Sequence, residues 1–286
     1  MIVLVALFFS LAAIFYSLEA FERAKTYYIY TLRLALKQEL IDEDSFLIPK
    51  LILKAKNTYI ENPYKPYYEE KLEKNHIHIK IVVKDDENLN INSIKDKNYY
   101  EVFHRLSENF CMPKDFDKYI YYWISGKNLG IKEESLSYPP PFQNMASKQE
   151  LIYATPYNNR FLYQNNCHKK TKGIWYVLDT KNEGLNINTV KLPILKSLNK
   201  DITDDIAREI INYRNAHTIK NLQDLVNIRG LSLDDVYKIE KLLSTSSKTL
   251  IILLKSSTQK GGVKENLTTK IYYSPIQNKI LGISWY

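Results

Sequence analysis

Glycine, cysteine and the signature motifs of common enzymes are scarce or missing in this chain of 286 residues. It contains 8 glycines and 2 cysteines. So few glycines argue against loops whose bare backbone wraps a phosphate group. The sequence has no Gly-x-Ser-x-Gly, no His-Glu-x-x-His and no Walker loop, which are the main signals of a hydrolase, a zinc protease and a nucleotidase. We therefore expect no catalytic residues and no enzymatic activity.

Weaker chemical patterns do not change this expectation. Ser-x-x-Lys occurs at Ser197–Lys200 and Ser257–Lys260, but a pattern this short arises by chance in a chain of this length. His76 and His78 would lie on one face of a strand, and two histidines without a cysteine or carboxylate partner in view are more often just exposed.

Hydrophobic residues and tyrosine are plentiful. Hydrophobic residues make up 45% of the chain, tyrosine occurs 23 times, and the net charge is +8. The chain can bury a substantial core, and its many tyrosines suggest surfaces that meet other proteins. The positive charge alone fits nucleic acid, anionic lipid or neither.

The chain opens with Ile2–Leu18, a run of 17 residues without a charge. As a helix it would span about 26 Å, slightly less than the roughly 30 Å of a bilayer core. A buried core helix and a cleaved signal peptide are alternatives, but apolar residues continue at helical spacing to Leu40, now with charges between them. We expect an uncut membrane anchor that continues into an amphipathic stem. The anchor residues are Ile2, Leu4, Leu7, Phe8, Leu11, Ile14, Phe15 and Leu18.

The stem is predicted to end near Ile48, because proline disfavours helix in the residue before it and Pro49 follows. Residues 51–60 form a second apolar run, and Asn62–Pro66 reads as a loop. Alternation from His76 to Val83 predicts a strand, with residues 85–88 as a turn.

A near-repeat then organises the middle of the chain. Leu89–Ser93 (LNINS) returns as Leu185–Thr189 (LNINT), 96 positions later. Leu and Ile alternate with Asn, as in a half-buried strand, and each copy ends in Ser or Thr, which often cap helices. Each copy is therefore predicted to be a corner between a strand and a helix capped by Ser93 or Thr189.

Periodicity and capping signals place the remaining elements. Ser147 and Glu150 form a capping box for a short helix over 147–153, and 173–178 is predicted to be a strand. Helices are expected near 204–214, 220–228 and 233–243. Three strands over 249–255, 267–273 and 279–285 close the chain as an antiparallel meander.

The order of these features resembles the type II secretion minor pseudopilin K family (general secretion pathway protein K). The resemblance covers nearly the whole chain and rests on order and spacing. The matching residues are the two corners, Tyr122–Ile124, Glu133 and Glu134 ahead of Tyr138, the prolines 139–141 with Asn144, Ser147–Leu151, and Ile211–Arg214.

The resemblance implies an α+β fold. A pilin-like long N-terminal helix would pack on an antiparallel sheet, with a large two-lobed all-helical insertion whose second lobe is SAM-like or helix-hairpin-helix-like. The expected segments are 1–48 for the anchor and stem, 49–95 for the first part of the sheet domain, 96–184 and 185–243 for the two lobes, and 244–286 for the closing strands.

The resemblance also implies a role in assembly. The expected protein caps the tip of a pseudopilus in protein export, anchored once in the inner membrane with its head in the periplasm. The implied partners are the I- and J-type minor pseudopilins and the major pseudopilin, with secreted cargo or the outer-membrane secretin as further partners. Pilin-like subunits carry a glutamate early in the apolar helix that this family lacks, and here no acidic residue precedes Glu19. The true N-terminus and a leader cleavage site stay open.

Calcium has been associated with the helical domain of this family, around an Asp-rich segment after Trp and Ile. Here Ser125, Gly126 and Lys127 follow Trp123-Ile124, and a lysine opposes calcium binding. Glu133 and Glu134 remain as calcium ligand candidates, with solvated loop acids as the alternative. No other cofactor is expected.

DNA gives a rival hypothesis, in which the chain serves a DNA-uptake machine. Residues 186–189, 210–214 and 222–225 also resemble a helix-hairpin-helix repeat like that of the competence DNA receptor. That chemistry needs glycine hairpins that approach phosphate, and Gly230 is the one glycine in this region. Residues 201–240 carry eight acidic against five basic residues, a net charge of −3 that would repel phosphate.

The two cysteines, Cys111 and Cys167, leave two readings open. A disulfide outside the cytoplasm would close a loop of 56 residues and contribute about 4 kcal/mol by chain-entropy reasoning. Two unrelated buried thiols are the other reading.

Overall fold

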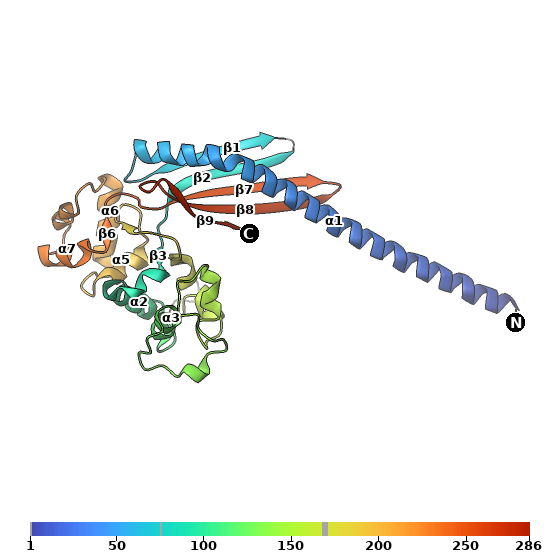
Figure 1. Cartoon of the computed structure of the whole chain (residues 1–286), viewed down its shortest axis with the longest axis horizontal. Coiled ribbons are helices and arrows are strands. Elements are labelled where there is room, and N and C mark those ends of the chain that lie inside the picture. The colour runs from blue at the N-terminus through green and yellow to red at the C-terminus, as the bar shows by residue number, and fades with distance from the viewer. Residues whose placement is uncertain (1, 75, 168–170) are drawn as a thin grey trace.

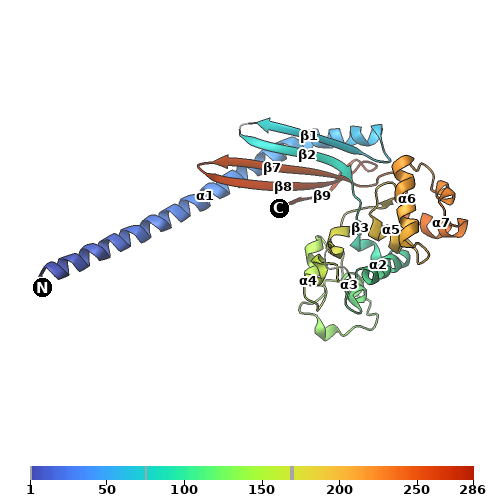
Figure 2. The same cartoon turned by 180° about the vertical axis from the view of Figure 1, so that it is seen from behind.

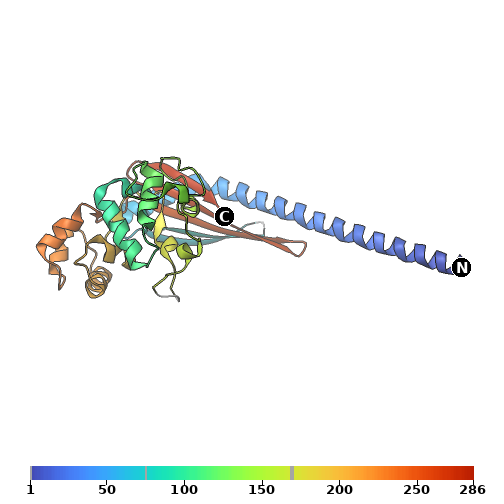
Figure 3. The ribbon, with the colours of Figure 1, turned by 90° about the horizontal axis from the view of Figure 1, so that it is seen from below.

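The computed structural model describes residues 2–74, 76–167 and 171–286, with side chains from residue 15 onward. Its parts are one long helix, an antiparallel sheet beside that helix, and a helical part at the far end of the sheet (Figure 1). The helix continues well beyond the sheet toward the N-terminus. Seen from below, the helical part lies at the opposite end from this projecting segment (Figure 3).

Helix α1 (Ile2–Glu61) has 60 residues, which corresponds to a length of about 90 Å. Residues 15–28 are exposed and Leu36 is buried, while Leu40, Leu51 and Ala55 belong to the core between α1 and the sheet. The predicted helix end near Ile48 is wrong, because the helix continues through Pro49. Pro49 leaves a backbone carbonyl without its helical donor, but its solvent-facing position keeps that carbonyl near water. Burial of Leu51 and Ala55 holds the last turns in place.

The sheet has five antiparallel strands in the order β1-β2-β7-β8-β9. Figure 2 shows them from behind, with α1 across one face. The strands are β1 (Tyr67–Lys74), β2 (Ile77–Asp85), β7 (Leu250–Lys260), β8 (Val263–Ser274) and β9 (Lys279–Trp285). Four of them match predicted strands. β1 was not predicted, because five of the eight residues of YYEEKLEK are charged and Glu70 lies between Tyr68 and Leu72, which pack on the core under α1.

One buried carboxylate ties α1 to the middle of the sheet. Asp44 accepts hydrogen bonds from Ser256 Oγ on β7 and Thr269 Oγ1 on β8, each at 2.5 Å. Burial raises the pKa of Asp44 above its ordinary value, although the two hydroxyl donors oppose the shift. The hydroxyls compensate a polar group that apolar packing alone would leave unsatisfied.

The chain leaves the sheet after β2 and returns at β7, and the helical part lies between. Its first half contains β3 (Leu89–Asn90), η1 (Ile91–Lys95), α2 (Lys97–Asn109), α3 (Phe116–Ser125), η2 (Glu133–Ser135), η3 (Lys148–Ile152), α4 (Arg160–Tyr163), η4 (Ile174–Val177) and β4 (Leu178–Asp179), where η denotes a 3-10 helix. Its second half contains β5 (Leu185–Asn186), α5 (Leu192–Leu198), α6 (Asp204–Ala216), η5 (Leu222–Asn227), α7 (Leu233–Glu240) and β6 (Leu243–Ser244). Both halves share one hydrophobic core, separate from the core under α1.

Several local predictions agree with these elements and one does not. The capping box at Ser147 and Glu150 is present and begins η3. α6, η5 and α7 lie where the last three helices were expected. The strand predicted over 173–178 is wrong, because residues 174–177 form the 3-10 helix η4 and just two strand residues follow.

Each near-repeat closes one half of the helical part. β3 pairs in parallel with β4, and β5 pairs in parallel with β6, so each corner is hydrogen-bonded to the segment that ends its own half. Within a corner the first Asn caps the following turn: Asn90 Oδ1 accepts from Asn92 N and Asn186 Oδ1 from Asn188 N. The predicted caps Ser93 and Thr189 are wrong, because Asp96 caps α2 by accepting from Asn98 N and Tyr99 N, and α5 begins after Lys191 without a side-chain cap.

The second Asn of each corner clamps two distant segments. Asn92 Nδ2 donates to the carbonyls of Met145 and Thr180, while its Oδ1 accepts from Met145 N. Asn188 repeats this pattern with the carbonyls of Ile219 and Thr245 and with Ile219 N, at 2.8, 2.8 and 2.9 Å. The second Asn thus makes the same set of hydrogen bonds in both copies of the repeat.

We predict that Asn188→Ala lowers the free energy of unfolding by about 2 to 4 kcal/mol, because it leaves buried backbone groups without partners. Urea unfolding followed by circular dichroism would measure the change. Asn227→Ala is the matched control, since Asn227 is exposed in the same half and should shift the midpoint little. Equal effects of both variants would contradict the clamp.

Candidate functional site

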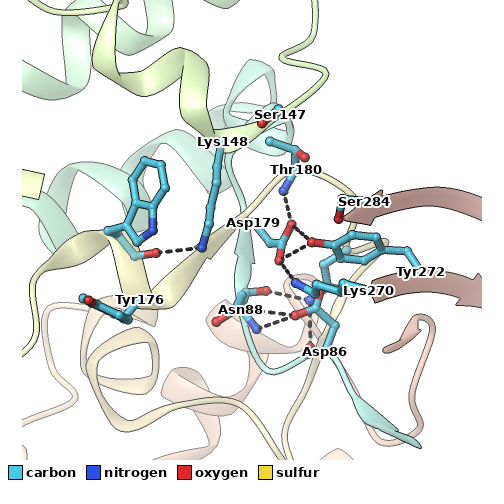
Figure 4. A network of polar contacts seen from close by, with 12 residues as sticks. Asp86, Asn88, Ser147, Lys148, Tyr176, Asp179, Thr180, Lys270, Tyr272 and Ser284 are labelled. Atoms are coloured by element: carbon cyan, nitrogen blue, oxygen red, sulfur yellow. Dashed lines mark hydrogen bonds and ion pairs between the residues drawn. The ribbon is translucent and has the colours of Figure 1, made fainter. Parts of the chain in front are cut away.

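Three chain segments lie at the junction between the sheet and the helical part: residues 85–90 leave the sheet, residues 178–186 connect the two halves of the helical part, and residues 243–249 return to the sheet. We refer to these segments as the three crossings. We call the polar residues that bond these crossings to one another and to β8 the joint. Its members are Asp85, Asp86, Asn88, Asp179, Asn182, Asn186, Ser247, Lys270 and Tyr272, and Figure 4 shows the part around Asp86 and Asp179.

Asp179 bonds the helical part directly to the sheet. Its carboxylate accepts from Lys270 Nζ at 2.5 Å and from the Tyr272 hydroxyl at 2.7 and 2.8 Å. Lys270 and Tyr272 both belong to β8, and Asp179 ends β4. Burial and then the Asp179 charge raise the pKa of Tyr272 far above its ordinary range, so Tyr272 keeps its proton and donates.

Asp86 is a buried carboxyl group of the joint with hydrogen bonds to one of its two oxygens. Its Oδ1 accepts from Asn88 N at 3.2 Å and Asn88 Nδ2 at 3.0 Å, whereas its buried Oδ2 has no hydrogen-bond partner among the described residues. Burial, and secondly the charge of Asp179, raises the pKa of Asp86 well above its ordinary value, while Lys270 opposes the shift.

Asn182 holds the backbone around Asp86. Its Nδ2 donates to the carbonyl of Asp86 at 2.9 Å and to that of Asn88 at 2.6 Å. Asn182 and Asp86 occupy equivalent positions of the two repeats, 96 residues apart, and each accepts a bond from the backbone N–H two residues later. The first two crossings are therefore bonded to each other by the Asn182 side chain, and Asn90 Nδ2 adds a bond to the Asn182 carbonyl at 2.6 Å.

A second centre of the joint surrounds Asp85. Its Oδ2 accepts from Asn186 Nδ2 at 2.9 Å and from the Thr189 hydroxyl. Asn186 Nδ2 also contacts Ser247 Oγ at 3.2 Å, which brings in the third crossing. Burial raises the pKa of Asp85 to about 6, against the opposing hydrogen bonds from Thr189, Asn186 and Ser247.

These contacts position the helical part on the sheet and compensate buried charge. Lys148 adds a further cation beside the joint, donating to the carbonyl of Trp175 at 3.4 Å with its Nζ 4.9 Å from the indole ring centre. Burial lowers the pKa of Lys148. Sequence reasoning missed the joint, although the acidic turn at 85–87 lay next to the first repeat.

The projecting segment of α1 is a second functional candidate. Between residues 15 and 30 it exposes a row of large apolar and aromatic side chains with exposed fractions of 54 to 76%. A monomer rarely leaves so much apolar surface open unless a partner or lipid covers it. We call this surface the bare rod, defined by Phe15, Tyr16, Leu18, Phe21, Tyr27, Tyr28 and Tyr30.

The predicted anchor falls mostly outside the described side chains. This holds for Ile2, Leu4, Leu7, Phe8, Leu11 and Ile14, while Phe15 and Leu18 belong to the bare rod. Within the described residues, no helix is both long and apolar enough to cross a membrane.

The calcium candidates Glu133 and Glu134 lie in the short helix η2, on the surface of the helical part. Glu133 Oε1 accepts from Asn128 Nδ2 at 2.7 Å. A hydrogen bond from Tyr122, and then the one from Asn128, lowers the pKa of Glu133. In the described part of the chain, no group of three or more His, Cys, Asp or Glu residues is arranged to hold a metal ion.

The structure joins Cys111 to Cys167 in a disulfide, with Cα atoms 5.4 Å apart. Cys111 follows the end of α2. The bridge closes the long segment of α3, η2, η3 and α4 into a loop of 56 residues. The disulfide therefore connects the two ends of a segment that contains few helices and strands.

We predict that Asp86→Asn flattens the pH dependence of stability. Because the folded-state pKa of Asp86 is raised, the folded chain keeps a proton that the unfolded chain releases above about pH 4. Wild-type unfolding free energy should therefore fall as pH rises from 4 through the folded pKa, by on the order of 2 kcal/mol for this residue. Urea unfolding at pH 5, 7 and 9 would measure it.

In that experiment Asp205→Asn makes the same charge change at an exposed site and should keep the wild-type slope. A wild-type slope in the Asp86→Asn variant would contradict the assignment.

We predict that reduction of the Cys111–Cys167 bridge lowers the free energy of unfolding by about 4 kcal/mol, because the open loop gains chain entropy on unfolding. Urea unfolding with and without reductant would measure it. A Cys111→Ser, Cys167→Ser double variant should match the reduced chain and show no response to reductant. A reductant effect of equal size in that variant would refute the explanation.

The comparisons with known proteins agree with the sequence resemblance. The family model of type II secretion system (T2SS), protein K, matches residues 185–246, the second half of the helical part. No curated protein matches the chain. A chain in the crystal structure of the GspK-GspI-GspJ complex from the enterotoxigenic Escherichia coli type 2 secretion system is similar in fold. Its TM-score is 0.62 at 14% identity, over 92% of this chain and 99% of that chain. The resemblance to minor pseudopilin K is thereby confirmed, as is the mixed fold of helix and antiparallel sheet.

Proposed function

We propose that this protein is a K-type minor pseudopilin of a type II secretion system, which takes part in protein export by joining the tip of a pseudopilus. The observation that carries the proposal is that the bare rod and the helical part lie at opposite ends of the molecule (Figure 1). The family match over 185–246 and the fold shared with the E. coli complex support the same role.

Before assembly, residues 2–18 would hold the protein in the inner membrane as a single anchor, with the head in the periplasm. The 17 uncharged residues at the start of the chain support this step. Glu19, Glu22, Arg23 and Lys25 follow directly and would remain in water or among headgroups.

In the assembled tip, the bare rod would pack on the corresponding helices of other subunits. The E. coli structure contains GspK with GspI and GspJ, and we propose I- and J-type minor pseudopilins as the partners of this chain. Aromatic side chains such as Phe21 and Tyr27 bury large areas and dominate many protein interfaces. The major pseudopilin would continue the assembly below.

The position of the helical part supports a capping role. It extends the molecule beyond the end of the sheet farthest from the projecting rod (Figure 3). A subunit stacked directly above would meet this bulk, and the same surface would be available to secreted cargo or to the outer-membrane secretin. The joint would keep this bulk in a fixed orientation.

Co-purification tests the proposal. We expect the full-length chain, tagged and extracted in detergent, to capture the I- and J-type minor pseudopilins of its own secretion system after co-expression. Phe21→Glu should reduce capture at least tenfold, because loss of a buried aromatic anchor costs about 2 kcal/mol or more. Quantitative immunoblotting of the eluate would measure it.

The matched control is Tyr237→Glu, which changes an aromatic side chain of similar exposure on α7, away from the rod. It should capture both partners at the wild-type level. Capture of neither partner by the wild-type chain, together with salt-sensitive binding of duplex DNA, would refute the secretion role.

A further inference from the structure

The two edges of the sheet differ in charge. The outer strand β1 carries five charged residues in eight, namely Glu69, Glu70, Lys71, Glu73 and Lys74. The opposite outer strand, β9, carries one in seven, Lys279, and reads KILGISW. Charges along an edge strand prevent it from pairing with other chains. β1 therefore has this protection and β9 lacks it.

The backbone of β9 is open to pairing on its outer side. Tyr286 exchanges both backbone hydrogen bonds with Thr268, at 2.9 and 3.1 Å. In an antiparallel ladder such pairs recur at every second residue, so Ser284 also faces β8. Ile283 and Trp285 therefore direct their N–H and C=O groups outward, and no further strand pairs with β9 in the described part of the chain.

The side chains of β9 divide between two surroundings. Ile283 lies opposite Ile271 and packs on the core under α1, and its neighbour Trp285 on the same face is 46% exposed. Gly282, Ser284 and Tyr286 face the helical part and line a cleft of about 230 Å³. On one face of the sheet, an added strand would continue the apolar surface of Ile283 and Trp285. On the other face, its side chains would enter this cleft.

Two of the three charged side chains that line the cleft are lysines. Its wall on the helical part includes Lys148, Asp179 and Lys181, and Lys270 already neutralises Asp179. Figure 4 shows Thr180 and Ser284 beside Asp179 and Tyr272, whereas the Lys148 side chain extends toward the carbonyl of Trp175. Lys181 lies across the strand at Gly282, where a Cβ atom would be 3.4 Å from Lys181 Cε. The glycine thus makes room for a cation beside the open edge.

We propose that β9 receives an extended segment of a partner protein as a sixth strand. This segment alternates apolar side chains, which continue the surface of Ile283 and Trp285, with acidic side chains, which face Lys181. Main-chain hydrogen bonds give such an added strand its affinity, and side chains on its two faces give its specificity. The register shift between Tyr272 and Tyr273 limits regular pairing to the last few residues of β9. This site is separate from the bare rod and does not depend on the proposed function.

A peptide titration tests the site. The probe is an eight-residue peptide of alternating Val and Glu, added to the full-length isotope-labelled chain in detergent. We expect saturable NMR shifts at the backbone amides of Ile283 and Trp285, and at least tenfold weaker binding of a peptide of alternating Val and Lys. Absence of saturable shifts at these amides, or equal binding of both peptides, would overturn the proposal.

Two variants make the test specific. Ile283→Pro removes an outward N–H that makes no bond to β8, which an edge strand tolerates, and should abolish binding while circular dichroism stays unchanged. Lys181→Glu should weaken binding of the Glu peptide at least tenfold and strengthen that of the Lys peptide, which tests the site even if the proline variant misfolds. Glu73→Ala on β1 is the control and should bind as wild type does. Wild-type affinity in a folded Ile283→Pro or Lys181→Glu chain would refute the site.

Discussion

Buried polar groups at the three crossings, where the sheet meets the helical part, constrain this structure more than any other feature. Three chain segments meet there away from water, and each brings backbone groups that must find partners. The side chains of Asn182, Asn186 and Asp179 supply those partners, and Lys270 and Tyr272 on β8 complete them. Apolar packing alone would leave these groups unsatisfied, so the joint sets how the helical part sits on the sheet.

The internal repeat explains how one chain builds such a joint twice. In both corners the first Asn caps a turn and the second clamps two remote segments, although the helices that follow differ in number and length. The copies diverge at one informative position, where the first has Asp86 and the second Asn182. An amide can donate as well as accept, whereas an ionised carboxylate can only accept. Asn182 Nδ2 donates to two carbonyls, whereas Asp86 Oδ2 has no hydrogen-bond partner among the described residues, and burial together with the charge of Asp179 raises the pKa of Asp86.

Sequence reasoning succeeded where one short segment determines its own structure. The capping box at Ser147 and Glu150 predicts η3, and three closing strands are predicted where β7, β8 and β9 lie. It failed where distant contacts decide. Pro49 stays inside α1 because burial on both sides outweighs its local cost, and β1 forms because β2 offers an edge. The alternation of Leu, Ile and Asn in the repeat is visible in the sequence, but the distant segments that Asn92 and Asn188 bond to are not. The joint could not be predicted, because Asp179 and Lys270 are 91 residues apart.

The joint also determines whether the cleft beside β9 exists. One wall of that cleft belongs to the helical part, at Lys148 and Asp179–Lys181, and the other belongs to β8 and β9. The bonds from Lys270 and Tyr272 to Asp179 cross between these walls and so fix their separation. A partner strand on β9 would meet Lys181 only while those bonds hold. Loosening the joint would therefore change the charge that faces the open edge, even though no residue of β9 itself had moved.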